Sequence, residues 1–395
     1  MSPGQIVAAI ILWGSLFLIW HTYFGIYLYL LIAAGFKNKK GSAGARLPDA
    51  DKPSIELPTL TVLIPAYNEE GVIAAKLENI LAQEYPRDRL EIVVASDLST
   101  DRTGEIVRGY AGRGVKLIVM LERSGKNGID DRLIPKAWGE VVAVTDANTM
   151  LEPGSLLKTA EHYLDPRVGA VCGNILVVPP RDSRNVEREV TYRRYELSIR
   201  RLMGRLGMVI GGIGGFYSLR RSLYRPIGTK PYHEDIVVLM EVLAQGYRVE
   251  FAEDGRATEE TTESIAREFR HRIRLTSYTP STLPRLLKLA WRAGPQALFL
   301  AFSYKVLRWL SPYLWLALFI SALLLGNVAA VYGVIAGLFI FGLAMAATGW
   351  LLDLAGIKAG IATASYHFAA MNLASYFGLA RWFKGMKPYW TPMER

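Results

Sequence analysis

The sequence predicts an α/β domain with a mostly parallel, doubly wound sheet, joined at both ends to apolar segments. Between Leu60 and Thr145, short apolar runs alternate with amphipathic helical segments, and this alternation is typical of parallel sheets. Hydrophobic residues make up 51% of the 395-residue chain and are concentrated towards its two ends. That concentration predicts membrane-spanning helices on both sides of the α/β domain.

The formal net charge of the chain is +10, and its only cysteine is Cys172. One cysteine excludes an internal disulfide and any metal site built from several cysteines. A net positive charge is typical of proteins that bind either nucleic acid or an anionic membrane surface. Because apolar spans are predicted at both ends, we expect a membrane partner and no nucleic acid.

Residues 1–36 are expected to form one transmembrane helix, because Ile6 to Phe36 is almost uncharged and exceeds the ~20 residues that a spanning helix requires. It is also too long for a signal-peptide core. Basic residues follow at once, at Lys37, Lys39 and Lys40, so the positive-inside rule places the next domain in the cytoplasm. Residues 37–57 are expected to be a linker, since they are rich in Gly, Ala and Pro.

The α/β domain is expected to occupy residues 58–280. Its predicted strands are Leu60 to Ile64, Leu90 to Ala95, Val115 to Leu121 and Val141 to Thr145. The helices predicted between them are Glu69 to Ala82 and Thr103 to Tyr110. The third strand is expected to lead into a loop over Arg123 to Lys126.

The strand Val141 to Thr145 runs directly into Asp146, and Asn148 follows two residues later. Ligands of open α/β sheets bind outside the carboxyl ends of the strands. A carboxylate and an amide oxygen placed there suit a divalent cation that holds a diphosphate. A strand followed by an Asx-turn has the same appearance, so the pattern alone leaves both interpretations open.

The other strand ends bring further polar groups to the same crevice. They are Ala66, Tyr67, Glu69, Asp97 and Lys126. An acid can hydrogen-bond a base or a ribose, and a lysine can meet a diphosphate. The set indicates a nucleotide-diphosphate site without the Gly-rich fingerprints of Rossmann and P-loop proteins.

The second half of the domain has a less regular pattern. A basic helix is predicted from Asn185 to Met203, whose arginines form either a solvated face or a surface for lipid phosphates or an acidic substrate. Gly211 to Gly215 contains four glycines and indicates either a close backbone approach or a flexible turn. Glu234 and Asp235 precede a helix predicted from Ile236 to Ala244, a position where an acid is most often a cap.

Beyond the domain the chain becomes membrane-like again. Residues 281–309 are expected to form interfacial amphipathic helices, and residues 310–380 two or three transmembrane helices. The last of these, Ile361 to Leu379, contains His367 and Asn372. We expect it to span, although a re-entrant or interfacial segment would better suit the basic tail at 381–395.

Taken in order, these residues make the chain resemble the membrane-integrated family 2 glycosyltransferases, an inverting group that includes cellulose, hyaluronan, chitin and poly-N-acetylglucosamine synthases. The resemblance covers about residues 58 to 280. It rests on Pro65 to Glu70 as the opening nucleotide loop, Ser96 to Thr103 as the second signature, Gly125-Lys126 as the Gly-Lys pair, Asp146 to Asn148 as the Asp-x-Asp, Glu234-Asp235 as the Glu-Asp pair and His271 to Leu275 in the place of Gln-x-x-Arg-Trp.

The resemblance implies a cytoplasmic GT-A-type domain in a multi-pass protein of the cell membrane. It implies that Asp235, beside Glu234, is the catalytic base, that Arg274 offsets charge on the leaving diphosphate, and that Asp146 and Asn148 hold magnesium or manganese. The nucleotide-binding residues it implies are Ala66, Tyr67, Glu69, Asp97, Lys126, Asp146 and Arg272. Those implied at the acceptor are Gly214, Gly215, Phe216, His271 and Leu275.

Three departures from the family pattern bear on the product. Asn148 replaces an acid, Asn127 to Asp131 lacks the usual Ala and Asn, and the Gln-x-x-Arg-Trp box keeps only Arg274. We therefore expect one or a few sugars to pass from a UDP-sugar to a membrane lipid or lipid-linked glycan. The alternatives are a processive synthase that exports a β-linked polysaccharide, and a non-catalytic nucleotide-binding partner of an export complex.

Overall fold

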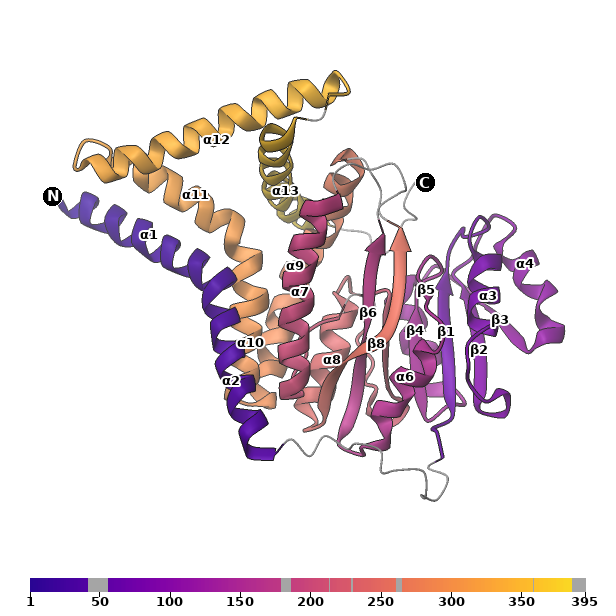
Figure 1. Cartoon of the computed structure of the whole chain (residues 1–395). Helices are drawn as coiled ribbons and strands as arrows, with labels where there is room; N and C mark the ends of the chain where they lie inside the picture. The colour runs from indigo at the N-terminus through magenta and orange to yellow at the C-terminus, as the bar shows by residue number, and fades with distance from the viewer. Residues whose placement is uncertain are drawn as a thin grey trace. The chain divides into compact units, whose positions relative to one another are not determined.

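Figure 1 shows the computed structural model of the chain, which describes residues 1–41, 56–178, 186–212, 214–228, 230–260, 265–357 and 359–385. The chain divides into two units, described here separately. The helical unit comprises Met1–Leu28, Ser264–Pro280 and Phe299–Met386, and the sheet unit comprises Tyr29–Glu263, Ser281–Leu298 and Lys387–Arg395. Most of the predicted linker, Ile213 and residues 386–395 of the predicted tail lie outside the described residues.

The sheet unit is built on one mixed sheet in the strand order β3-β2-β1-β4-β7-β6-β8-β5. The strands are β1 Leu60–Ala66, β2 Leu90–Ser96, β3 Val115–Val119, β4 Val141–Thr145, β5 Met150–Leu151, β6 Val168–Val178, β7 Phe216–Arg220 and β8 Arg248–Glu260. Pairs β1–β2, β2–β3, β1–β4 and β6–β8 are parallel, whereas β7 runs antiparallel to both neighbours and β5 to β8. The predicted α/β fold with a mostly parallel sheet is confirmed.

Strand β4 lies between β1 and β7 in the interior of the sheet. Every residue of β4 is buried, which explains why its sequence is continuously apolar instead of alternating. The first polar side chain beyond its buried Thr145 is that of Asp146. The burial of β4 therefore fixes where the sheet presents this acid.

The helices of the sheet unit are α3 Ile73–Leu81, α4 Thr103–Gly109, α5 Gly125–Leu133, α6 Ser155–Glu161, α7 Val186–Leu206 and α8 Glu234–Ala244. Short 3-10 turns lie at Arg87–Arg89, Ala111–Arg113, Ile134–Lys136, His162–Leu164 and Arg221–Leu223. Helix α3 packs Ile73, Leu77 and Ile80 into the core beside β1 and β4. This spacing is the amphipathic pattern from which the helix was expected.

Three features of the sheet unit differ from the prediction. Strands β5, β6, β7 and β8 were not foreseen, and β8 carries charged residues along its length that obscure an apolar pattern. Gly125 and Lys126, expected in a loop, begin α5. Glu234 and Asp235, expected before a helix, form the first turn of α8, whose N-cap residue is His233.

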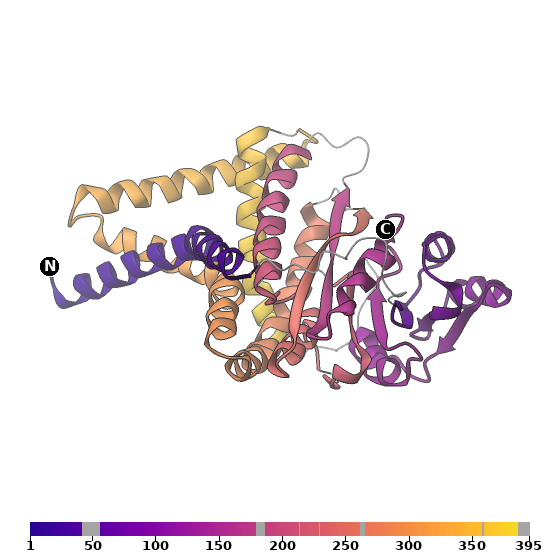
Figure 2. The same cartoon turned by 60° about the horizontal axis from the view of Figure 1, so that its bottom comes forward.

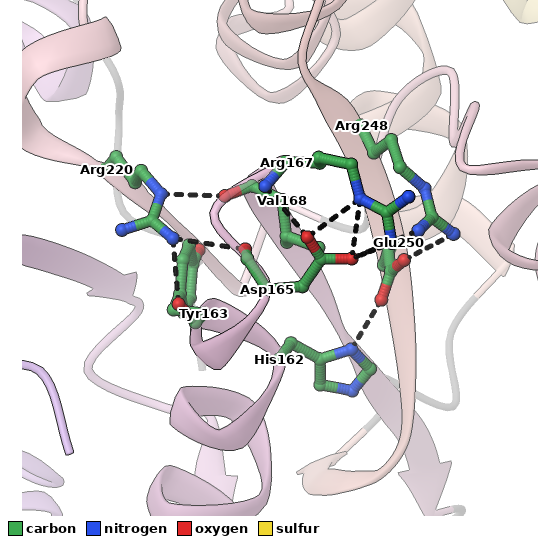
Figure 3. A network of polar contacts seen from close by, with 8 residues as sticks. All are labelled: His162, Tyr163, Asp165, Arg167, Val168, Arg220, Arg248 and Glu250. Atoms are coloured by element: carbon green, nitrogen blue, oxygen red, sulfur yellow. Dashed lines mark hydrogen bonds and ion pairs between the residues drawn. The ribbon is translucent and has the colours of Figure 1, made fainter. Parts of the chain in front are cut away.

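A polar network ties together the starts of β6 and β8 (Figure 3). Its ion pairs join Asp165 to Arg167 and Arg248, and Glu250 to Arg248. A hydrogen bond joins Glu250 to His162, and Arg220 donates to the carbonyls of Tyr163, Asp165 and Val168. Strands β4, β6 and β8 run in one direction, so this network lies at their amino ends. It connects these strands at the end of the sheet opposite to Asp146.

The helical unit contains most of the long apolar helices. The helices outside the sheet core are α1 Pro3–Trp20, α2 Ile26–Gly41, α9 Ile265–Ala293, α10 Pro295–Leu300, α11 Leu307–Leu325, α12 Ala330–Leu354 and α13 Gly360–Phe383, with π-helical turns at His21–Gly25 and Ala301–Val306. Figures 1 and 2 both show α1 running alongside α11. Ala8 and Leu12 of α1 share a buried cluster there with Leu318, Ala322 and Leu325.

Within the part of the chain that the structure describes, three helices are long and apolar enough to cross a membrane, namely Pro3–Phe36, Pro295–Leu325 and Ala330–Leu354. Apolar helices of this type are therefore confirmed at both ends of the chain. The second begins before the expected residue 310, because Gly294 adopts φ +105° and Pro295 then starts a new helix. The crossing of a membrane by α13 remains a prediction.

Candidate active site

The loops that follow β1 and β2 are bonded to each other. The Asn68 side-chain oxygen accepts the Thr100 N–H at 2.8 Å, and the Glu69 N–H donates to Thr103 Oγ1 at 2.8 Å. Asn68 and Leu98 have φ of 53° and 57°, a left-handed conformation that Asn tolerates better than most residues. The two predicted nucleotide loops therefore lie side by side.

Asp97 connects the end of β2 to the start of α5. Its carboxylate accepts the N–H groups of Ser124 at 2.7 Å and Gly125 at 3.0 Å, and Arg123 Nε at 3.2 Å. The residue is 2% exposed. Ala66 and Glu69 are also buried. The structure thus shows Asp97 in a holding role, and nucleotide contacts by these three residues remain predictions.

Arg123 was not foreseen as part of the site. Its guanidinium lies 3.3 Å from the centroid of the Tyr67 ring, a stacked cation–π arrangement. The same side chain is bonded to Asp97. Tyr67 and Arg123 therefore form one flat, positively charged platform beside the predicted nucleotide loops.

A cavity of about 420 Å³ opens near the ends of β2 and β3. Its lining includes Ser96, Ser99, Asp101, Arg102 and Arg108. The lining does not include Lys126, Asp146 or Glu234. The space beside Asp146 is thus distinct from this cavity.

Lys126 joins three separate segments of the chain. Its Nζ donates to Asp146 Oδ1 at 2.8 Å and to the Gly214 carbonyl at 2.5 Å, and pairs with Glu234 Oε1 at 3.2 Å. The side chain is 15% exposed. Burial alone would lower the pKa of Lys126, but the carboxylates of Asp146 and Glu234 outweigh it and raise that pKa. Lys126 is therefore charged and held between two acids.

Asp146 and Asn148 present their side chains at the carboxyl end of β4, as predicted. The Asp146 carboxyl is 35% exposed, and its backbone N–H donates to the Gly215 carbonyl at 3.1 Å. Asn148 Nδ2 donates to Glu259 Oε1 at 3.1 Å, so Glu259 orients this amide, a contact that the sequence did not suggest. Oxygen donors of this kind fit a hard divalent cation.

The cation site is incomplete from protein groups alone. Among the residues that the structure describes, no three His, Cys, Asp or Glu side chains gather closely enough to hold a metal ion. Magnesium in particular is often bound through one or two carboxylates plus substrate phosphates and waters. The residues present therefore fit a cation that arrives with a diphosphate.

The glycine cluster approaches the site closely, as one of the two interpretations predicted. A Cβ atom on Gly214 would lie 3.2 Å from Glu234 Oε1, and one on Gly215 would lie 2.7 Å from Thr149 Oγ1. Phe216, expected at the acceptor, is 0% exposed and belongs to the core. That assignment is wrong for its side chain, because Phe216 packs closely over Gly173 inside the sheet unit.

Glu234 belongs to the same cluster as Asp146, and Asp235 is its neighbour in the chain. Glu234 is bonded to Lys126, which in turn is bonded to Asp146. Asp235 follows in the first turn of α8. A Cβ on Gly212 would be 4.0 Å from the Asp235 Cβ, so Asp235 also borders the glycine cluster.

Two further buried ionisable groups support the cluster. Tyr217 donates to Asp130 Oδ2 at 3.1 Å, and burial raises the pKa of Asp130 to about 8 although Lys126 opposes the shift. Burial lowers the pKa of Lys76 to about 7, with the Asp146 carboxylate opposing. Lys76 had a signal in the sequence, because it occupies the apolar face of α3 between Ile73 and Ile80.

The remaining predicted residues, His271, Arg272, Arg274 and Leu275, lie on α9 within the helical unit. Burial lowers the pKa of His271 to about 4, and Arg274 adds to the shift. His271 is therefore neutral at physiological pH. The roles expected for these four residues at the leaving group and the acceptor remain predictions.

Comparison with known proteins gives consistent matches. Residues 61–228 match the family model described as Glycosyl transferase family 2. The chain is 30% identical over 258 residues to the probable glycosyltransferase YdaM of Bacillus subtilis, covering 60% of this chain and 58% of the relative. It is 31% identical over 174 residues to the beta-monoglucosyldiacylglycerol synthase of Nostoc sp., covering 42% and 35%. Poly-beta-1,6-N-acetyl-D-glucosamine synthase of Staphylococcus aureus is 29% identical over 210 residues, covering 51% and 50%.

The chain thus spans between about a third and three fifths of the length of these relatives. Among solved structures, the mannosyltransferase PcManGT from Pyrobaculum calidifontis, in complex with GDP-Man and Mn²⁺, matches with a TM-score of 0.63. The match is 22% identical and covers 94% of this chain and 99% of that one. At this identity the likeness concerns the fold.

Proposed function

We propose that this chain, which carries a family 2 glycosyltransferase domain with a GT-A-type fold, is an inverting enzyme that transfers a sugar from a UDP-sugar to a membrane acceptor. One observation supports the proposal most directly. Lys126 contacts both Asp146, at the predicted donor site, and Glu234, beside the predicted base. The residues predicted for the donor and those predicted for the base therefore meet at one side chain.

At the donor end, Lys126 supplies a positive charge for the diphosphate, and the Tyr67–Arg123 platform offers a face for the base. Asp146 and Asn148 would hold a magnesium or manganese ion. When bound, that ion would offset the charge that develops on the departing diphosphate. Arg272 and Arg274 of α9 are proposed to add to this stabilisation.

At the acceptor end, Asp235 takes the proton of the acceptor hydroxyl as that oxygen bonds to the anomeric carbon. The bond between the sugar and the diphosphate breaks at the same time, and UDP leaves with its electron pair. Attack occurs from the face opposite to UDP, so an α-linked donor gives a β-linked product. Gly214 and Gly215, whose backbones approach Glu234 and Thr149 closely, are proposed to border the acceptor.

We propose a lipid or lipid-linked glycan as the acceptor, in a multi-pass protein of the cell membrane with its catalytic domain in the cytoplasm. The three long apolar helices support this placement. The relative named beta-monoglucosyldiacylglycerol synthase supports a lipid acceptor. The relative named poly-beta-1,6-N-acetyl-D-glucosamine synthase favours a second candidate, a processive synthase that exports its polysaccharide. His271 and Leu275 offer no large aromatic ring on which a growing sugar chain could stack, and this supports the lipid or lipid-linked acceptor.

The test uses the purified full chain with a panel of nucleotide sugars and a lipid extract. UDP release and product mass are measured together. A lipid-soluble product of discrete mass is expected. A high-molecular-weight ladder that a glycan hydrolase digests would establish the processive alternative. UDP binding without release of UDP from any donor would favour a non-catalytic partner of an export complex instead.

A further inference from the structure

Helix α3 carries a polar stripe on a face that is otherwise apolar. Ile73, Leu77 and Ile80 of α3 pack in the core, yet Lys76 between them is 0% exposed. Lysine is almost never fully buried unless its ammonium is paired. The partners of Lys76 therefore indicate why it is there.

The Lys76 ammonium is bonded to both ends of one short segment. Its Nζ donates to Thr145 Oγ1 at 2.9 Å and to the Thr149 carbonyl. Thr145 is the last residue of β4, and Thr149 directly follows Asn148. A single side chain, that of Lys76, therefore hydrogen-bonds to both ends of the turn that contains Asp146 and Asn148.

Asn79 and Gln83 continue the same contact one and two turns later. Asn79 Nδ2 donates to the Leu151 carbonyl at 2.8 Å, and the Leu151 N–H donates back to Asn79 Oδ1 at 2.8 Å. Gln83 Nε2 donates to the Glu152 carbonyl at 3.2 Å. Leu151 belongs to β5, which pairs with β8 at the far edge of the sheet from β3. Side chains of α3, and of Gln83 just beyond its end, therefore fix the chain where it passes from β4 to β5.

Packing alone does not account for Lys76. Taking an ammonium out of water costs several kcal/mol, and replacing a buried charge by an apolar residue of similar volume is often neutral or stabilising. A methionine would fill the same space without that cost. The hydrogen bonds to Thr145 and Thr149 are what a lysine adds.

We propose that Lys76 is a positioning residue that holds the Asp146–Asn148 turn in the conformation that binds the divalent cation with UDP. The inference rests on the proposed function of this site. Lys76 acts through the turn and touches neither ligand of the cation. Groups that orient metal ligands in this way typically account for 10- to 100-fold in metal affinity.

The test compares the full chain with Lys76→Met, using UDP and Mn²⁺ as the probes. In Lys76→Met we expect the affinity for Mn²⁺ in the presence of UDP to fall by about 10- to 100-fold, while the melting temperature stays the same or rises. At saturating Mn²⁺ the transfer rate largely recovers. A purely structural role would instead lower the melting temperature and leave the Mn²⁺ affinity of the folded protein unchanged.

Thr145→Val removes only one acceptor of Lys76 and should weaken Mn²⁺ binding less, in the same direction. This variant decides the question if Lys76→Met does not fold. Glu78→Gln, on the exposed face of α3 where Glu78 pairs with Arg113, is the control and should bind Mn²⁺ like the parent. If both test variants bind Mn²⁺ as tightly as the parent, the inference about Lys76 is refuted and the proposed function stands. A parent that binds no UDP in the presence of Mn²⁺ overturns the proposed function as well.

Discussion

Replacing Lys126 by methionine tests the centre of the site. The change removes the charge that lies 2.8 Å from Asp146 Oδ1 and 3.2 Å from Glu234 Oε1. Those two oxygens are therefore at most about 6 Å apart. At an effective dielectric constant of ~20, two like charges at that distance repel by about 3 kcal/mol. Without Lys126, this repulsion should lower the stability of the fold by a similar amount.

The same substitution should separate nucleotide binding from cation binding. A hydrogen bond to a charged group contributes about 1.5–3 kcal/mol, so UDP affinity should fall roughly 10- to 100-fold. Mn²⁺ should stabilise Lys126→Met more than the parent, because a dication relieves the repulsion that Lys126 otherwise removes. Calorimetric titration with UDP and thermal unfolding with and without Mn²⁺ measure the two effects. Lys136→Met, at an exposed position, is the control.

Two results would refute this reasoning. The first is parental UDP affinity in a folded Lys126→Met protein, which would remove Lys126 from the donor site. The second is an equal thermal response to Mn²⁺ in variant and parent, which would mean that Asp146 and Glu234 do not share the charge of Lys126. Either result can be read separately, because the titration and the unfolding curve are independent measurements.

Three further predictions concern Asp235, Asn148 and Asp130. Asp235→Asn should reduce transfer by ~10²–10⁴ while UDP affinity in calorimetry stays near that of the parent; turnover within about tenfold of the parent would remove the base assignment. Asn148→Asp places a carboxylate against Glu259, now 3.1 Å from the amide, so its melting temperature should drop in EDTA and respond to Mn²⁺ more than that of the parent; an unchanged response would argue against a cation at this turn. Asp130 has a pKa of about 8 in the fold against 3.8 as its ordinary value, so the folded state binds the extra proton and stability should fall as pH rises from about 4 to 8. Asp130→Asn should abolish that decline in thermal unfolding curves. Asp165→Asn in the network of Figure 3 is the matched control. Arg167 lowers the pKa of Asp165 to about 2, so loss of the Asp165 carboxylate should destabilise the protein at neutral pH. A decline of stability with pH that persists in Asp130→Asn would contradict the assignment to Asp130.

The sequence predicted best those strands that are buried on both faces. Strand β4 was predicted residue by residue because a strand buried on both faces has an unbroken apolar sequence. Strand β8 was missed because charged residues such as Glu250 and Arg256 alternate with its buried ones and form contacts that only the folded chain brings together. The apolar helix Pro295–Leu325 was predicted too short, since Lys305 and Arg308 interrupt its pattern without interrupting its backbone.

Within the site, the motifs located the acids but did not reveal what each acid contacts. For Asp97 the motif predicted a nucleotide contact, which remains a prediction, but it gave no sign that the carboxylate also accepts the N–H groups of Ser124 and Gly125 at the start of α5. Phe216 was expected at the acceptor, whereas it fills the core. Such partners lie far away in the sequence, so spacing alone cannot assign them. Lys76 is the converse case, because a charge on the apolar face of a helix is visible in the sequence although its partners are not.

The charges around Asp146 explain why this edge of the sheet suits a cation with a diphosphate. Asp146 and Glu234 bring two carboxylates to one place, and Lys126 is bonded to both of them. Lys76 adds a second amine beneath the turn, but burial lowers its pKa to about 7, so it neutralises little of the charge above that pH. The cluster therefore keeps net negative charge, which attracts a dication. A diphosphate alone would be repelled by the same carboxylates unless Lys126 turned towards it. Donor and cation thus suit this site together better than either does alone.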